Sequence, residues 1–165
     1  MSNDLLLAFY ADDFTGATAV LEGLARNGVT AVLFVDSPTE ADIGRFVDID
    51  VIGVAGRSRS MAPEQMASEL PGIFRDLDAL SAPLVHYKVC STFDSAPEIG
   101  SIGLAIDLAR DVFEPSYVPL SQMSMVPSNR YVAFGNLFAE TEEGVYRIDR
   151  HPTTRVCSDR AHSKE

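Results

Sequence analysis

Short apolar runs alternate with stretches of helical period along most of this chain, and this alternation limits the folds that are open to it. The apolar runs, taken as strands, are residues 5–10, 29–35, 50–56 and 83–89, and the expected helices are residues 15–27, 63–80 and 99–113. Strands that alternate with helices favour a parallel sheet covered on both faces. The sequence therefore predicts an α/β fold, a three-layer sandwich with a mainly parallel, doubly wound (Rossmann-like) sheet.

The remaining segments carry weaker signals. Pro71 is expected to kink or split the second helix, and Ser37–Glu40 offers a short helical start. Residues 117–120 read as a short strand, and residues 123–129 show no pattern. Residues 130–139 read as one strand that pairs through a turn at 142–144 with residues 145–148, giving a C-terminal β-hairpin. From His151 onward we expect a loose tail.

Length and composition exclude several classes of protein. The chain has 165 residues, which fits one domain, and no apolar run approaches the roughly 20 residues that span a bilayer. We find no secretory signal, and two distant cysteines suit a reducing, cytoplasmic location. A formal net charge of −11 argues against binding to nucleic acid or an anionic membrane. An anionic ligand would therefore need local positive groups.

Three polar loops follow the first, third and fourth expected strands. Because parallel strands joined by right-handed crossovers end at one edge of a sheet, these loops are expected to converge into a ligand site. The candidate residues, in chain order, are Asp12, Asp13, Thr15, Gly16, Arg57, Arg59, Lys88, Ser91, Thr92, Asp94 and Ser95.

Each candidate also has a simpler interpretation. Asp13 alone can be the N-cap of the first helix, and the serines and threonine can cap the last one. Arg57 and Arg59 can be solvated surface residues. In a site, the arginines and Lys88 would bind a carboxylate or phosphate, and an aspartate would act as general base toward a hydroxyl.

Familiar catalytic motifs are absent from the sequence. There is no G-x-x-x-x-G-K-[ST] or G-x-G-x-x-G loop for a nucleotide phosphate, and no G-x-S-x-G elbow. His86, His151 and His162 are isolated and Cys90 has no histidine partner in the pattern, so no metal site is predicted.

Several stretches together resemble the four-carbon acid sugar kinases. They are Ala-Asp-Asp-Phe-Thr-Gly-Ala at 11–17, Gly-Arg-Ser-Arg-Ser at 56–60, Tyr-Lys-Val-Cys-Ser-Thr-Phe-Asp-Ser at 87–95, Gly100, Ile102 and Gly103, residues 132–139 and residues 149–152. The resemblance implies an N-terminal domain that binds the sugar acid, and a separate C-terminal domain that binds ATP with Mg²⁺. Such enzymes phosphorylate the terminal hydroxyl of 3-oxo-tetronate, threonate or erythronate.

By this resemblance, Asp12 and Asp13 would face the substrate hydroxyls, and one of them would be the base. Arg59 and Lys88 would hold the carboxylate or approach the transferred phosphate, and Ser91, Thr92, Asp94 and Ser95 would line the pocket. We expect residues 1–152 to form the sugar-acid-binding domain and residues 153–165 a disordered, non-native tail, with the ATP-binding domain absent. The chain alone would then bind neither ATP nor Mg²⁺ and would be inactive.

Two other functions stay open at this point. The chain can be a stand-alone module that binds or senses small acids without catalysis. A phosphatase that uses aspartate is less favoured, because such enzymes space two aspartates one residue apart, whereas Asp12 and Asp13 are adjacent. A missing second domain would expose apolar surface, which favours self-association or contact with a separate ATP-binding domain.

Overall fold

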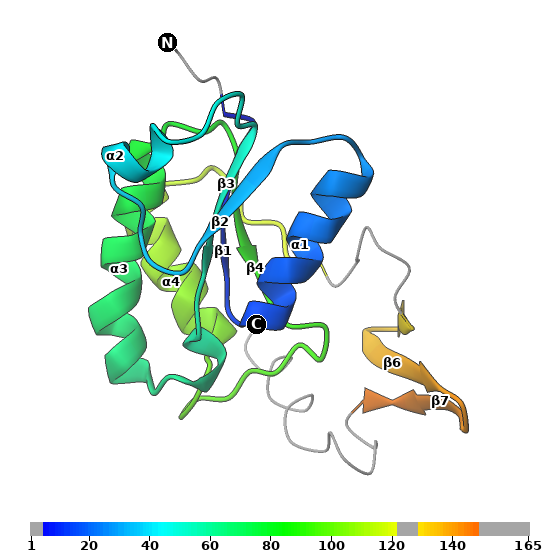
Figure 1. Cartoon of the computed structure of the whole chain (residues 1–165). Helices are drawn as coiled ribbons and strands as arrows, with labels where there is room; N and C mark the ends of the chain where they lie inside the picture. The colour runs from blue at the N-terminus through cyan, green and yellow to red at the C-terminus, as the bar shows by residue number, and fades with distance from the viewer. Residues whose placement is uncertain (1–4, 122–128, 149–165) are drawn as a thin grey trace.

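The structure, a computed structural model, describes residues 5–121 and 129–148, which form an α/β body and a small antiparallel sheet to its side (Figure 1). The body holds four parallel strands: β1 (Leu7–Ala11), β2 (Ala31–Phe34), β3 (Val51–Ala55) and β4 (Val85–Lys88). Their order is β2-β3-β1-β4, so β1 is central, with β3 on one side and β4 on the other. The predicted parallel, doubly wound α/β fold is confirmed.

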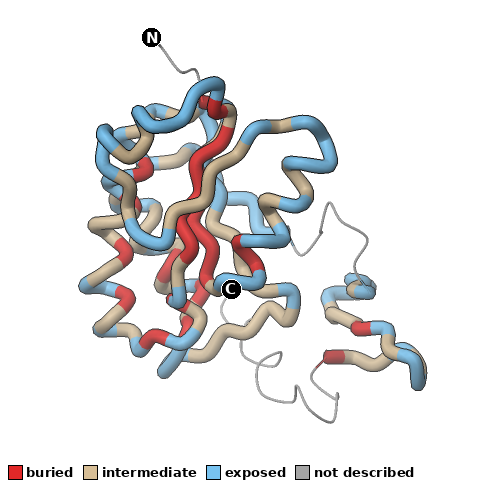
Figure 2. Tube along the Cα trace, viewed as in Figure 1, coloured by how far each residue is buried: buried red, intermediate tan, exposed pale blue. Residues whose placement is uncertain are grey.

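Helices cover both faces of this sheet because the side chains of β1 alternate between them. Phe9 and Ala11 pack toward α1 (Phe14–Arg26), whereas Ala8 and Tyr10 pack toward α3 (Pro63–Ala79) and α4 (Ile102–Phe113). The core therefore follows the two central strands, as the buried segments in Figure 2 show. The short helix α2 (Glu40–Ile43), with Thr39 as its N-cap, lies where a short helical start was expected.

Pro71 was expected to kink or split the second helix, and it does not split it, because α3 continues through it. Proline removes the N–H that would bond to the carbonyl four residues earlier, here Ala67. Ala67 is exposed, so water can satisfy that carbonyl. The apolar face of α3, with Met66, Leu70 and Phe74 buried, stabilises the helix on both sides of the proline.

Helix α4 begins later than predicted, at Ile102, because the Ser101 side chain accepts a hydrogen bond from the Leu104 N–H and forms the N-cap. The helix ends at Phe113, as expected. The predicted strand at 117–120 is absent, and these residues form no regular structure. Pro119 lies inside that segment and has no N–H to contribute to a ladder.

The small sheet has the order β5-β6-β7: β5 (Arg130–Ala133), β6 (Asn136–Thr141) and β7 (Gly144–Arg147). The turn before β7 and its antiparallel pairing with β6 are confirmed. The single strand predicted at 130–139 is wrong, because Phe134 (φ 51°) and Gly135 (φ 74°) form a two-residue turn that divides it. The segments predicted at 123–128 and from His151 onward lie outside the described residues.

Candidate functional site

The candidate site lies at the carboxyl ends of the central strands, at the lower edge of the sheet in Figure 1. The chain leaves β1 toward α1 on one face, whereas it leaves the neighbouring strands β3 and β4 toward helices on the other face. A crevice opens where adjacent connections diverge in this way, and open α/β sheets bind their ligands there.

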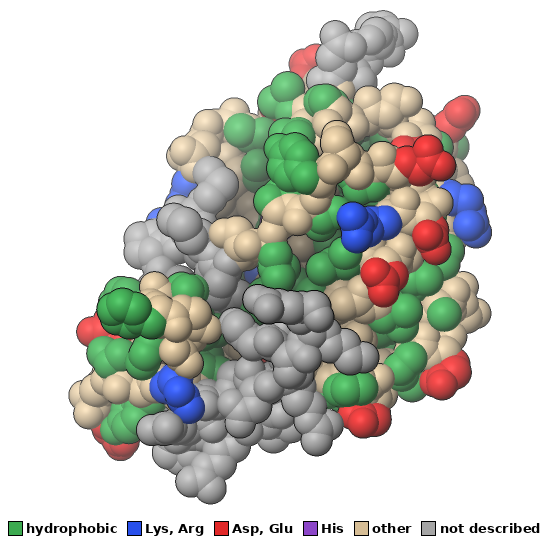
Figure 3. Space-filling view, turned by 180° about the vertical axis from the view of Figure 1, so that it is seen from behind, with side chains coloured by type: hydrophobic (Ala, Val, Ile, Leu, Met, Phe, Trp, Pro, Cys, Tyr) green, Lys and Arg blue, Asp and Glu red, His purple; other side chains and the backbone are tan. Residues whose placement is uncertain are grey.

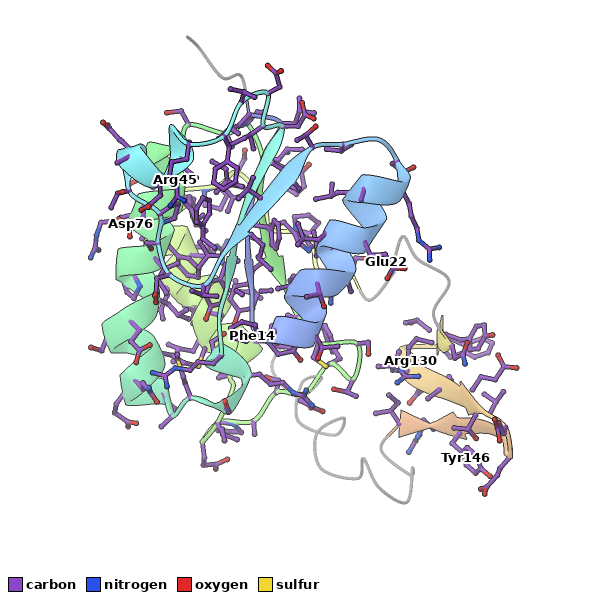
Figure 4. The ribbon with its side chains drawn as sticks, in the orientation of Figure 1. Phe14, Glu22, Arg45, Asp76, Arg130 and Tyr146 are labelled. Atoms are coloured by element: carbon purple, nitrogen blue, oxygen red, sulfur yellow. The ribbon has the colours of Figure 1, made fainter. Side chains whose placement is uncertain are left out.

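A cavity of about 360 Å³ occupies this position. It lies between the loop after β1, the loop after β3 and the segment that leads to α4, and its lining residues are Asp12, Asp13, Phe14, Gly56, Arg57, Arg59, Ser60 and Ile99. Figure 4 shows Phe14 at the start of α1, at this edge of the sheet. The acids of the first loop and the arginines of the third strand's loop thus meet at one cavity.

Arg59 ties the three polar loops together. Its Nη1 lies 3.2 Å from Asp13 Oδ2, and its Nε and Nη2 both donate to Asp94 Oδ2, with the Nε bond at 3.0 Å. Nη2 also donates to Thr92 Oγ1 at 3.3 Å. The guanidinium therefore has two carboxylate partners within the protein, and its charge is neutralised before any ligand arrives.

The N-cap interpretation of Asp13 is confirmed. Its Oδ1 accepts a hydrogen bond from the Gly16 N–H and so caps α1, while its Oδ2 pairs with Arg59. A side chain on Gly16 would contact both the Asp13 carboxylate and Lys88, so the glycine is needed for this close approach. Asp13 thus serves the helix and the ion network together.

The other predicted residues do not line the cavity. Lys88 Nζ donates to the Val89 carbonyl. The Ser95 hydroxyl accepts a hydrogen bond from the Ile102 N–H at 3.0 Å and so supports the first turn of α4. This agrees with the simpler interpretation of Ser95 as a residue that caps the last helix. Thr15 and Ser91 are exposed.

Arg57 lines the cavity with most of its side chain in solvent. The side chain is 67% exposed, and Nη2 lies 3.4 Å from Glu69 Oε1, a loose surface pair. The chain carries a formal net charge of −11, and acidic side chains are scattered over the face shown in Figure 3. An exposed guanidinium at the mouth of the cavity therefore supplies the local positive charge that an anionic ligand needs.

Sequence reasoning missed Phe14 and Ile99 as cavity residues. Both are large apolar side chains that stay exposed, 56% for Phe14 and 49% for Ile99. Phe14 stands inside the motif that carries the acids, and its position there was the signal that could have identified it. Ile99 precedes α4 and has no chemical signature in the sequence.

The pKa values of the two adjacent acids shift in opposite directions. Burial raises the pKa of Asp12 from 3.8 to about 6, and the negative charge of Asp13 adds to the rise, while the Cys90 N–H, Lys88 and Arg59 oppose it. For Asp13 burial also acts to raise the pKa, but hydrogen bonds from Gly16 and Cys90 and the charge of Arg59 outweigh it and lower the pKa. Asp12 therefore changes protonation closer to neutral pH than Asp13.

Replacing Asp12 with asparagine is expected to stabilise the protein at pH 7.5 by about 1–2 kcal/mol. Between about pH 4 and 6 the unfolded chain releases a proton that folded Asp12 keeps, so this group's contribution to stability falls as pH rises. The full shift corresponds to roughly 3 kcal/mol, and the gain is smaller than this because the amide of the substituted side chain also needs hydrogen-bond partners.

Urea denaturation of wild type and Asp12→Asn at pH 4, 5, 6 and 7.5 measures this effect. The exposed Asp76→Asn on α3 serves as the control and should stay within about 0.5 kcal/mol of wild type at every pH. A loss of stability in Asp12→Asn at pH 7.5 would contradict the prediction.

The described residues hold neither a cluster of metal ligands nor a helix that could span a membrane. Over residues 5–121 and 129–148, no group of three or more His, Cys, Asp or Glu side chains is placed to hold a metal ion. In the same part of the chain, no helix has the length and apolar character needed to cross a bilayer.

Comparison with known protein families gives a match over almost the whole chain. A family described as the sugar-binding N-terminal domain matches residues 7–158. A 3-oxo-isoapionate kinase from Paraburkholderia graminis is 46% identical over 149 residues, covering 90% of this chain and 32% of the kinase. A 3-oxo-tetronate kinase from Pseudomonas fluorescens is 29% identical over 153 residues, covering 90% of this chain and 34% of the kinase.

Solved structures share the fold. The crystal structure described as a "putative tRNA synthase" from Salmonella typhimurium LT2 superposes with a TM-score of 0.74 at 28% identity, covering 91% of this chain and 35% of that one. The present chain thus spans about a third of the length of the curated relatives and of the solved structure that it matches.

Proposed function

This chain belongs to the family of sugar-binding N-terminal domains, and we propose from this premise that its cavity holds a four-carbon sugar acid for phosphorylation at the terminal hydroxyl. The observation that carries the proposal is the meeting of Asp12, Asp13, Arg57 and Arg59 at one cavity, at the carboxyl edge of a doubly wound sheet. The named relatives are kinases of 3-oxo-isoapionate and 3-oxo-tetronate, and the chain matches their sugar-binding part.

The size and polarity of the cavity suit a small hydroxy acid. Its volume of about 360 Å³ lies at the lower end of the range for small-molecule sites. Carboxylate oxygens accept hydrogen bonds from ligand hydroxyls, and the exposed guanidinium of Arg57 can pair with a ligand carboxylate. Arg59 and Lys88 were also expected to bind that carboxylate. They would pair with it directly only if they released their present hydrogen-bond partners within the protein.

The same cavity does not fit a nucleoside triphosphate such as ATP. Two of its four charged residues are acids, and Arg59 is already paired with Asp13 and Asp94. A triphosphate carries several negative charges and requires a cradle of donors and cations. We propose that ATP and Mg²⁺ bind to the part of the kinase that lies beyond this match, and that this chain alone positions the acceptor hydroxyl without turnover.

A four-carbon sugar acid is expected to raise the melting temperature of this chain by roughly 5 °C at a concentration of about 100 times Kd, because a ligand that binds only the folded state stabilises it. Thermal unfolding with threonate, erythronate and 3-oxo-tetronate measures the shift, with ATP alone as the comparison that should give none. Asp13→Ala, which removes the N-cap of α1 and a partner of Arg59 at the cavity, should abolish the shift. If none of the acids shifts the melting temperature, the proposal is wrong.

A further inference from the structure

The side chain of Asp12 is buried at the cavity with one oxygen unused. Asp12 is only 3% exposed, although it is among the cavity's lining residues. Its Oδ2 accepts a hydrogen bond from the Cys90 N–H at 3.1 Å, whereas its buried Oδ1 has no hydrogen-bond partner in the described part of the protein. A buried carboxylate oxygen without a donor is costly, so this position favours a ligand that brings a donor.

Asp13, its neighbour, has both oxygens engaged. The Gly16 N–H occupies Oδ1, and Arg59 Nη1 occupies Oδ2 at 3.2 Å. A ligand hydroxyl could bind Asp13 strongly only by displacing the helix cap or the arginine. The two adjacent acids therefore differ in what they can offer a ligand.

The main chain holds Asp12 in place from both sides. Its N–H donates to the Lys88 carbonyl at 2.9 Å, and its carbonyl accepts from the Arg59 N–H at 3.2 Å. The loops after β3 and β4 thus fix the backbone on which the unused oxygen stands. Such a fixed acceptor discriminates between ligands better than a mobile surface carboxylate.

We propose that Asp12 Oδ1 accepts the hydrogen bond of the terminal hydroxyl of the sugar acid, and that Asp13 does not touch this hydroxyl. The inference rests on the proposed function, since it assigns an atom to the group that would receive the phosphoryl group. Asp12 is then the residue of the pair that touches the reacting group, and Asp13 is a positioning residue that acts through Gly16 and Arg59.

A pair of ligands that differ only in this hydroxyl tests the assignment. Threonate carries it, and 2,3-dihydroxybutanoate of the same configuration lacks it. Isothermal titration of wild type should show the deoxy compound binding about 10- to 100-fold more weakly, the range for a hydrogen bond to a charged group. In Asp12→Asn the ratio should fall to about 3-fold or less, and in the matched variant Asp13→Asn it should stay close to the wild-type ratio.

The outcomes separate the two proposals. If wild type binds neither acid, the proposed function fails and this inference fails with it. If wild type binds both acids equally, or if Asp12→Asn keeps the full ratio, the sugar-acid site stands and the assignment to Asp12 is wrong. A ratio that falls only in Asp13→Asn would transfer the contact to Asp13. Asp12→Ala, checked for folding by circular dichroism, is a second variant that lacks the Asp12 carboxylate and should also lose the affinity ratio.

Discussion

Replacing Arg59 with alanine is expected to lower the free energy of unfolding by roughly 2–4 kcal/mol. Asp13 and Asp94 are only 21% and 23% exposed, and both lose their cationic partner when the guanidinium is removed. Thr92 Oγ1 loses a donor as well. Since Arg59 joins the loops after β1, β3 and β4, all three should loosen together.

Arg57→Ala is the matched control, because Arg57 stands two residues away on the same loop and forms only a loose, exposed pair with Glu69. Its loss should cost less than about 1 kcal/mol. Urea denaturation of both variants at pH 7.5 measures the difference. Equal losses in the two variants would show that the Arg59 network does not hold the loops.

Arg57→Ala should weaken the binding of a sugar acid far more than it lowers the stability of the fold. Arg57 lines the cavity with its charge only loosely paired to Glu69, so Arg57→Ala is expected to weaken threonate binding about tenfold while leaving the fold intact. The sequence presents Arg57 and Arg59 as equivalent cations in the series Arg-Ser-Arg-Ser. Only the structure distinguishes an arginine consumed by internal carboxylates from one that faces solvent at the mouth.

The convergence of the loops could be predicted because it follows from topology alone. Buried parallel strands such as Val51–Ala55 appear in the sequence as continuous apolar runs, and the carboxyl ends of parallel strands share an edge. The partners within the site could not be predicted, because they depend on distances between residues far apart in the chain. Arg59 and Asp94 are one example, and Asp12 and the Cys90 N–H are another.

The local errors have separate physical causes. Pro71 has a strong intrinsic tendency to break a helix, but packing of the apolar face of α3 overrides it. The turn at Phe134 and Gly135 lacks the Asn-Gly or Asp-Gly pair that usually marks a two-residue hairpin, so apolar composition favoured one strand through it. Ile99 reaches the cavity through the path of the chain before α4, which no pattern in the sequence specifies.

Replacing Gly100 with alanine is expected to lower the free energy of unfolding by roughly 3–5 kcal/mol. Its φ is +58°, a left-handed conformation that costs alanine about 1–2 kcal/mol. A Cβ there would overlap the carbonyl oxygen of Arg59 and lie 2.9 Å from its carbonyl carbon. These are backbone atoms, so no side-chain rotation can relieve the contact.

The damage should reach the site, because the Gly100 N–H also donates to the Met61 carbonyl at 2.9 Å and so holds the chain before α4 against the loop after β3. Moving the Arg59 backbone would shift its guanidinium away from Asp13 and Asp94. Gly72→Ala is the matched control, because Gly72 lies inside α3 with no neighbouring group within 4 Å, and alanine there should stabilise the helix by about 0.5–1 kcal/mol. Urea denaturation and threonate titration of both variants measure the two effects. Wild-type stability in Gly100→Ala would mean that the segment before α4 can move away from Arg59 at little cost. The contacts of Gly100 would then not hold the loops of the site in a fixed position.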